Sequence, residues 1–177
     1  MGSLEYGARQ AVRCCLHVEA GEEAVLITDR ETAEIADALE GELRQAGARV
    51  SRFVMEEFGE RPEDGSAPLA LPAVVAEKLR AASTSVYAAT GKRGELQSFR
   101  TPMLQLVGSL SRLKHAHMPG VTRQIMEMGM SADYEEVQRR NRLVYETVCP
   151  ASAIRVTSPA GTDFTVRFHP GWKWVNS

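Results

Sequence analysis

Apolar positions along the first part of the chain follow two kinds of spacing. Residues 4–18 and 32–46 carry apolar side chains three and four positions apart, a period that predicts amphipathic helices. Residues 25–28 are a short apolar run, which is typical of a strand buried on both faces, and a second strand is marked by Val50, Phe53, Val54 and Met55. Gly47 stands where the C-terminal cap of the second helix is expected. We therefore expect an N-terminal helix followed by a β-α-β unit with parallel strands.

The same alternation continues to about residue 148. Helical spacing recurs at 71–82, 101–114, 121–129 and 133–148, and strand-like runs lie at 85–89 and 115–118. Asp133 and Glu136 have the spacing of a reciprocal N-terminal cap for the last helix. Residues 56–70 lack an apolar pattern and are expected to form a long surface loop. This order predicts an α/β fold with a Rossmann-like open, mostly parallel sheet flanked by helices.

The pattern changes after Pro150. Residues 154–158 and 164–168 alternate with a period of two around a turn at 159–163, which predicts a C-terminal antiparallel β-hairpin. We therefore expect an α/β N-terminal domain over 1–150, with a hairpin and tail over 151–177 that begin a second domain or contact a partner. Residues 169–177 have no partner segment, so we expect the first half of a longer protein. A naturally short gene is the alternative.

Composition and charge exclude several classes of protein. The sequence is 44% hydrophobic and 25% charged, as in soluble globular proteins, with no apolar run near the ~20 residues of a membrane span. Its net charge of −2 gives no reason to expect nucleic acid or a membrane surface as a partner. The cysteines are odd in number and form no Cys-x-x-Cys motif: Cys14, Cys15 and Cys149. We expect them to be reduced and mostly buried, which suits the cytoplasm.

Three stretches carry a family resemblance. They are Cys15-Leu16-His17-Val18 through Gly21-Glu22 to Val25-Leu26-Ile27-Thr28-Asp29; Met118-Pro119-Gly120-Val121-Thr122 followed by Asp133-Tyr134-Glu135-Glu136; and, most specifically, residues 154–166. Together they resemble the leucyl-aminopeptidase family, which includes aminopeptidase T and aminopeptidase S, the thermophilic metalloproteases. The chain is also similar to the 2,5-dihydroxypyridine dioxygenases, which cleave an aromatic ring.

The resemblance covers only the N-terminal half of a family member. It implies a metallopeptidase that hydrolyses N-terminal residues from peptides with two divalent metals, zinc or cobalt, bound by residues of the C-terminal half. That half is absent here, so no catalytic residue and no cofactor is carried over to this chain, and the 177 residues alone are expected to be inactive. This domain would supply scaffold and one wall of the substrate cavity.

Two alternatives to the peptidase domain stay open. One is a stand-alone, catalytically inactive protein derived from such a peptidase, which binds a peptide, for instance as a helper in a biosynthetic pathway. The other is part of a ring-cleaving dioxygenase relative. In each case the expected ligand is a peptide or a small molecule.

Candidate ligand-binding residues lie at the carboxyl ends of predicted strands, where open α/β sheets bind ligands. Thr28 and Asp29 end one strand, and Lys92 and Arg93 stand in the Gly91–Gly94 loop after another. The two basic side chains could bind a carboxylate or phosphate, but the spacing matches neither a Walker A loop nor a dinucleotide fingerprint. A surface turn is the favoured interpretation of this loop.

Acidic and imidazole side chains form two weaker candidates. The loop carboxylates could attract the ammonium of a peptide, although a solvated loop is favoured: Glu56, Glu57, Glu60, Glu63 and Asp64. His115 and His117 share one face of a strand and are weak candidates for a metal. No carboxylate lies near them in sequence, so a hydrogen-bonded pair is the favoured interpretation.

Trp172 and Trp174 stand together in the tail. They could stack on a ligand, because an indole ring offers a large contact area. Packing against the hairpin or a partner subunit is favoured, and with the open hairpin edge it predicts a homodimer.

Overall fold

The computed structural model describes residues 2–175 and separates the chain into two compact units, Met1–Ser131 and Ala132–Ser177. The boundary differs from the expected one after Pro150, because the helix before that proline groups with the hairpin.

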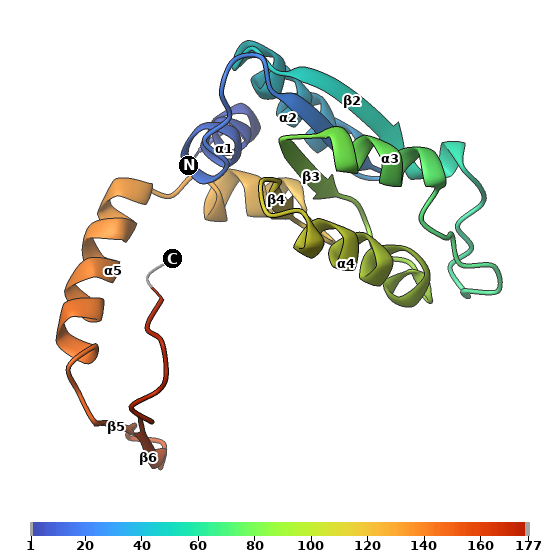
Figure 1. The fold of residues 1–177 in the computed structure, drawn as a ribbon. Helices are drawn as coiled ribbons and strands as arrows, with labels where there is room; N and C mark the ends of the chain where they lie inside the picture. Colours follow the sequence, from blue (N-terminus) through green and yellow to red (C-terminus); the bar gives the residue numbers. More distant parts are fainter. Residues whose placement is uncertain (1, 176–177) are drawn as a thin grey trace. The chain divides into compact units, whose positions relative to one another are not determined.

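A four-stranded parallel sheet forms the centre of the first unit (Figure 1). Its strands follow the order β2-β1-β3-β4, with bounds β1 Glu23–Thr28, β2 Arg49–Val54, β3 Thr84–Ala88 and β4 Lys114–His117. β1 pairs with β2 on one side and with β3 on the other. The connection after β1 therefore leads to β2 at one side of the sheet, and the connection after β3 leads to β4 at the other side. The two connections part between β1 and β3. Such a divergence opens a crevice at the carboxyl ends of the strands.

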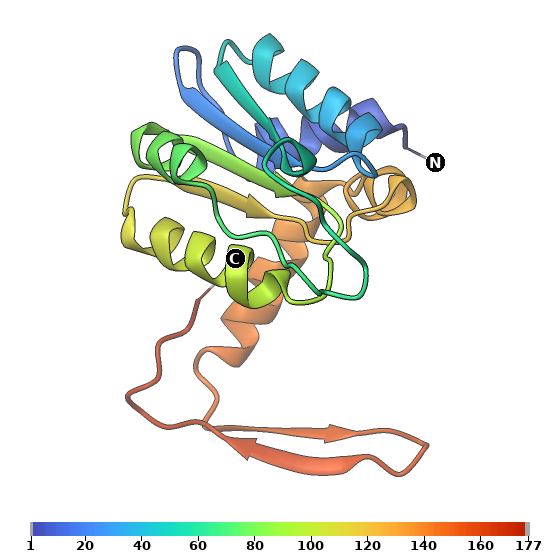
Figure 2. The same ribbon diagram turned by 90° about the vertical axis from the view of Figure 1, so that its right-hand side faces the viewer.

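Helices cover both faces of the sheet, as Figures 1 and 2 show. On one face, α1 (Leu4–Arg9) and α2 (Ala33–Gln45) pack with Leu26 and Val86 of the sheet. On the other, α3 (Ala73–Ala81) and α4 (Thr101–Ser109) pack with Val25, Ile27 and Tyr87. Alternate residues along the strands thus belong to two apolar cores, one on each face, as expected for a sheet covered on both sides. The predicted α/β fold class is confirmed.

Three predicted helices differ in their internal hydrogen bonding. The segment expected at 4–18 is α1 followed by a π-helix, Gln10–Cys15, in which the amide of Leu16 bonds to the carbonyl of Ala11. The segment expected at 101–114 starts earlier, as a π-helix over Leu96–Arg100, and α4 ends at Ser109. The segment expected at 121–129 contains a third π-helix, Ile125–Gly129. Apolar spacing predicts a helix but does not distinguish the wider π turn.

The second unit consists of α5 (Tyr134–Val148) and an antiparallel hairpin, β5 (Ala153–Thr157) with β6 (Asp163–Arg167). The hairpin was predicted, with each strand displaced by one residue. None of residues 132–175 is buried. The ring centroids of Trp172 and Trp174 lie 6.4 and 4.7 Å from that of Phe168, the residue after β6.

Capping of α5 follows the sequence in part. Asp133 accepts hydrogen bonds from the amides of Glu135 and Glu136 at 3.1 Å each, as an N-cap does. The Glu136 carboxylate instead accepts hydrogen bonds from Arg139 and Arg140.

Two expectations about solvent exposure can be compared with the structure. All three cysteines are free, but none is buried: Cys15 is exposed, and Cys14 and Cys149 are half-buried, so the expectation that most are buried is wrong. Within residues 2–175, no helix is both long enough and apolar enough to cross a membrane.

Candidate functional site

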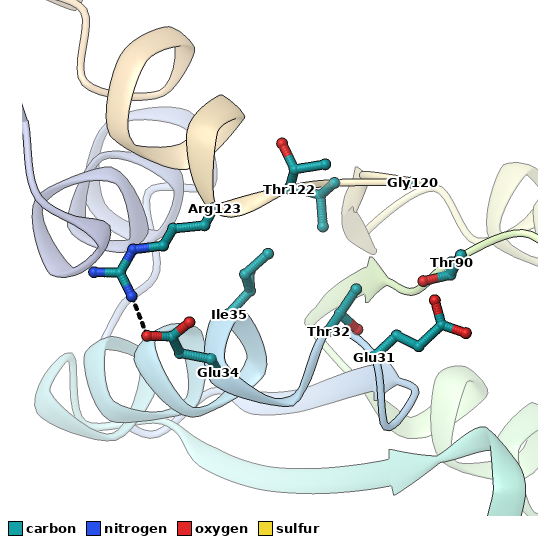
Figure 3. Close-up of a pocket in the computed structure, with 9 residues that line it drawn as sticks. Glu31, Thr32, Glu34, Ile35, Thr90, Gly120, Thr122 and Arg123 are labelled. Atoms are coloured by element: carbon teal, nitrogen blue, oxygen red, sulfur yellow. Dashed lines mark hydrogen bonds and ion pairs between the residues drawn. The ribbon is translucent and has the colours of Figure 1, made fainter.

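A pocket of about 340 Å³ lies at the carboxyl ends of β1, β3 and β4 in the first unit (Figure 3). It is lined by residues that follow these three strands: Glu31, Thr32, Glu34, Ile35, Thr90, Gly120, Val121, Thr122 and Arg123. Ligands of open α/β sheets bind at this edge, next to the point where the connections diverge. The pocket is therefore the candidate functional site.

The start of α2 forms one wall of the pocket. Thr32 is the N-cap residue of α2, and Glu34 and Ile35 lie in its first turn. The first amides of a helix have no partners within it, and the helix dipole places partial positive charge there. This wall can therefore accept a negatively charged ligand group.

Charged side chains of both signs line the pocket. Arg123 forms an ion pair with Glu34, drawn at one side in Figure 3, and a second one with Glu127 at 2.7 Å. Glu31 forms an ion pair with Lys92, and its side chain stays 55% exposed. The Arg123–Glu34 pair is exposed at both partners and therefore contributes little to stability, so a ligand can displace it without a large loss.

Behind the pocket, Arg61 reaches in from the 56–70 loop and is buried, with only 2% of its side chain exposed. Nε and Nη2 donate to the two oxygens of Glu95 at 2.7 and 2.8 Å. Nη1 donates to Asp29 at 2.9 Å and to Glu56 at 2.8 Å. Burial alone would lower the pKa of Arg61, but these hydrogen bonds to Glu95, Asp29 and Glu56 raise it above its ordinary value.

Thr28 and Asp29, two of the predicted ligand-binding residues, are buried beneath the pocket and do not line it. The Asp29 carboxylate accepts hydrogen bonds from Arg61, from the amide of Thr32 at 2.9 Å and from the amide of Thr90 at 2.6 Å. Burial would raise the pKa of Asp29, but hydrogen bonds from Arg61 and Thr32 hold it below its ordinary value. Thr28 Oγ1 lies 3.0 Å from Thr32 Oγ1. These two residues therefore support the pocket from behind.

The basic loop after β3 also lies outside the pocket lining. The Lys92 ammonium is held between Glu31 and Glu63. Arg93 is exposed. Lys92 can act on a ligand only through Glu31, whose carboxylate it holds at the pocket.

The acidic loop has a more specific arrangement than the solvated loop expected for it. Glu56 belongs to the Arg61 cluster, and Glu63 pairs with Lys92. Asp64 accepts a hydrogen bond from the amide of Ser66 at 2.9 Å, whereas Glu57 and Glu60 are exposed.

His115 and His117 lie on the face of β4 that packs beneath α4, and their ring centroids are 5.7 Å apart. Nδ1 of His115 is 2.8 Å from Ser85 Oγ. Burial lowers the pKa of His115 to about 4, and burial with the nearby Arg100 lowers that of His117. Both imidazoles are therefore neutral at pH 7.

A protein metal site usually needs three or more side-chain ligands, and these two histidines supply only two. Among residues 2–175, no three His, Cys, Asp or Glu side chains form a group that could hold a metal. The residues that the structure describes therefore do not fit the two-metal centre implied for a full-length family member.

The sequence did not single out Arg61, Glu95 or Arg123. Arg61 is the only basic residue of the acidic stretch 56–70, and a lone cation among carboxylates was an available signal. Arg123 follows the Met118–Thr122 stretch that carries part of the family resemblance. Glu95 had no local signal, because its partner is 34 positions away in the sequence.

No protein-family profile and no curated protein sequence matches this chain. Solved structures with the same fold include a 2,5-dihydroxypyridine dioxygenase from Pseudomonas putida KT2440, with 13% identity and a TM-score of 0.57 over 93% of this chain and 47% of the dioxygenase. They also include wild-type AmpT from Thermus thermophilus, with 18% identity and a TM-score of 0.54 over 93% of this chain and 53% of AmpT. The chain thus has the fold expected from the family resemblance and spans about half the length of each structure.

Proposed function

We propose that this chain is an aminopeptidase-like α/β domain whose pocket binds a short peptide. The observation that carries the proposal is the pocket at the carboxyl ends of β1, β3 and β4, which is lined by charges of both signs. A peptide has an ammonium at one end and a carboxylate at the other, so a pocket that binds it needs both negative and positive groups. The shared fold with AmpT supports this assignment over an unrelated binding function.

Each end of the ligand has a matching group in the pocket. Glu31 offers a carboxylate to the ammonium, and the exposure of its side chain leaves it accessible. The start of α2 and the guanidinium of Arg123 offer positive charge to the carboxylate. Ile35 and Val121 provide apolar contact for a side chain between the two ends.

Within a longer aminopeptidase, this domain would act as scaffold and as one wall of the substrate cavity. Hydrolysis would depend on residues outside this chain, since the described residues form no group suited to metals. As a stand-alone protein, the same pocket would bind a peptide without turning it over.

A relative of the ring-cleaving dioxygenases is the second candidate, because the fold matches that enzyme over the same share of this chain. Its ligand would be an aromatic ring such as a dihydroxypyridine. The pocket favours the peptide, because its lining residues include charged and aliphatic side chains but no aromatic one.

Isothermal titration of the chain with Leu-Gly, N-acetyl-Leu-Gly and 2,5-dihydroxypyridine tests the proposal. We expect Leu-Gly to bind with one-to-one stoichiometry and acetylation to weaken binding about tenfold, because the ammonium is lost. Glu31→Gln should weaken Leu-Gly binding to a similar extent and leave the acetylated peptide unaffected.

The matched control is Glu77→Gln, because Glu77 is exposed on α3 and does not line the pocket. This variant should bind Leu-Gly as the unmodified chain does. Binding of the dihydroxypyridine alone would favour the dioxygenase relative. Absence of binding by both peptides would contradict the peptide assignment.

A further inference from the structure

All five N–H groups of the Arg61 guanidinium donate hydrogen bonds, and four of them go to carboxylates of Asp29, Glu56 and Glu95. The fifth goes from Nη2 to the carbonyl of Thr90 at 2.6 Å. An arginine has five such groups, so its hydrogen-bonding capacity is filled. The cluster is buried, with Asp29 and Glu95 exposed by 0% and 1%.

Arg61 holds the backbone of Thr90 from both sides. Its guanidinium donates directly to the Thr90 carbonyl. It also donates to Oδ2 of Asp29, and the same oxygen accepts a hydrogen bond from the Thr90 amide. Thr90 lines the pocket, whereas Arg61 does not.

The opposite oxygen of Asp29 holds a second pocket wall. It accepts from the amide of Thr32 at 2.9 Å and lies 2.8 Å from Thr32 Oγ1. That hydroxyl is also 2.7 Å from the carbonyl of Ala88, so its single proton can serve one of the two acceptors at a time. Thr32 begins α2, and the Asp29 carboxylate therefore joins the connection after β1 to the connection after β3.

We infer that Arg61 is a positioning residue for the pocket: through Asp29 it fixes Thr32 and Thr90, which form two walls of the ligand site, although Arg61 itself does not line the pocket. This inference rests on the proposed function for the identity of the ligand. The geometry of the two walls can be measured without a ligand.

Stability alone is a weak explanation for this cluster. A buried ion pair often stabilises a fold no better than apolar residues of similar volume, because the charges lose their hydration. Its geometric effect is more specific, since the planar guanidinium fixes the direction of each bond. Lysine retains the charge at this position but cannot make the same five directed contacts.

Amide hydrogen exchange on Arg61→Lys is the first experiment, with Arg112→Lys as the matched control. Arg112 is exposed, in the connection between α4 and β4, and does not line the pocket. In Arg61→Lys we expect the protection of the Thr32 and Thr90 amides against exchange to fall about tenfold. Both amides donate to the Asp29 carboxylate, and they open locally more often when Arg61 no longer holds that carboxylate in place. Protection of residues 25–27 in β1 should stay unchanged in both variants. Unchanged protection at Thr32 and Thr90 would overturn the inference.

Leu-Gly titration of the same variants provides the second readout. Arg61→Lys should lower the affinity about tenfold, with no change in Arg112→Lys. If the unmodified chain does not bind Leu-Gly, the proposed function fails, but the exchange result still decides whether Arg61 positions the walls.

Asp29→Asn covers the case in which Arg61→Lys does not fold. In either orientation of its amide, an asparagine at position 29 has a single oxygen, so it cannot accept from both Thr32 and Thr90. We expect loss of protection at one of these two amides. Full protection of both amides in this variant would contradict the inference.

Discussion

At the scale of single residues, two side chains that were predicted to bind a ligand are instead bound by other residues of the protein. Asp29 was predicted at the correct end of the correct strand, yet both carboxylate oxygens are occupied by protein donors. Lys92 is likewise held between two glutamates. The sequence could place these side chains near the crevice because strand ends follow from the apolar runs. It could not predict their partners, because Arg61 lies 32 positions from Asp29, and Glu31 and Glu63 lie 61 and 29 positions from Lys92.

The buried histidine pair makes stability depend on pH. Burial lowers the pKa of His115 to about 4, whereas the unfolded chain binds a proton near its ordinary value of 6.5. Between these values the unfolded state therefore holds the extra proton, so the free energy of unfolding should fall as pH decreases from about 6.5 to about 4. This contribution is fully present above that window.

Urea unfolding across this range measures the effect, with His115→Asn as the comparison. The variant cannot take up the proton at this position, so the difference in unfolding free energy between the two proteins should change through the window. Parallel pH profiles for the two proteins would show that His115 is not responsible.

At the scale of elements, the existence of helices and strands was easier to predict than their internal geometry. All four parallel strands lie within two residues of their predicted ends. Burial on both faces leaves a continuous apolar signal only in β1 and β3, whereas β2 and β4 are half-buried and carry polar residues. The three π-helices were not predicted, since one wider turn barely alters apolar spacing over so few residues. The helix α5 was predicted from its cap as well as its pattern.

The N-cap of α5 should matter more than a cap usually does. Helix stability in proteins comes mostly from packing, and none of the side chains of α5 is buried. Asp133→Ala removes the acceptor for two amides and should destabilise the helix by about 1 kcal/mol. Circular dichroism should show a loss of helical signal, and Asp133→Asn should retain most of it. Equal signals from the alanine variant and the unmodified chain would contradict this role.

At the scale of the whole molecule, the apolar cores belong to one unit. Every buried member of the two core clusters precedes residue 131, and none of residues 132–175 is buried. The sequence predicted two regions but placed the boundary at the proline after α5. Periodicity identifies a helix without showing which neighbours it packs against, so it could not assign α5 to a unit.

A fragment comprising residues 1–131 should therefore fold independently. We expect cooperative thermal unfolding within a few degrees of the whole chain, because the fragment retains the sheet, both cores and the Arg61 cluster. Differential scanning calorimetry measures both transitions. A fragment that lacks a cooperative transition would mean that residues 132–177 supply stabilising contacts to the first unit.

The Arg61 cluster also bears on the order of events during folding. Its carboxylates come from three separate stretches of chain, and they meet only after β1 and β3 have paired across some sixty intervening residues. A charge removed from water before its counter-charges arrive is strongly disfavoured. We therefore expect the cluster to assemble late in folding, so that the loss of Arg61 would raise the unfolding rate more than it lowers the folding rate.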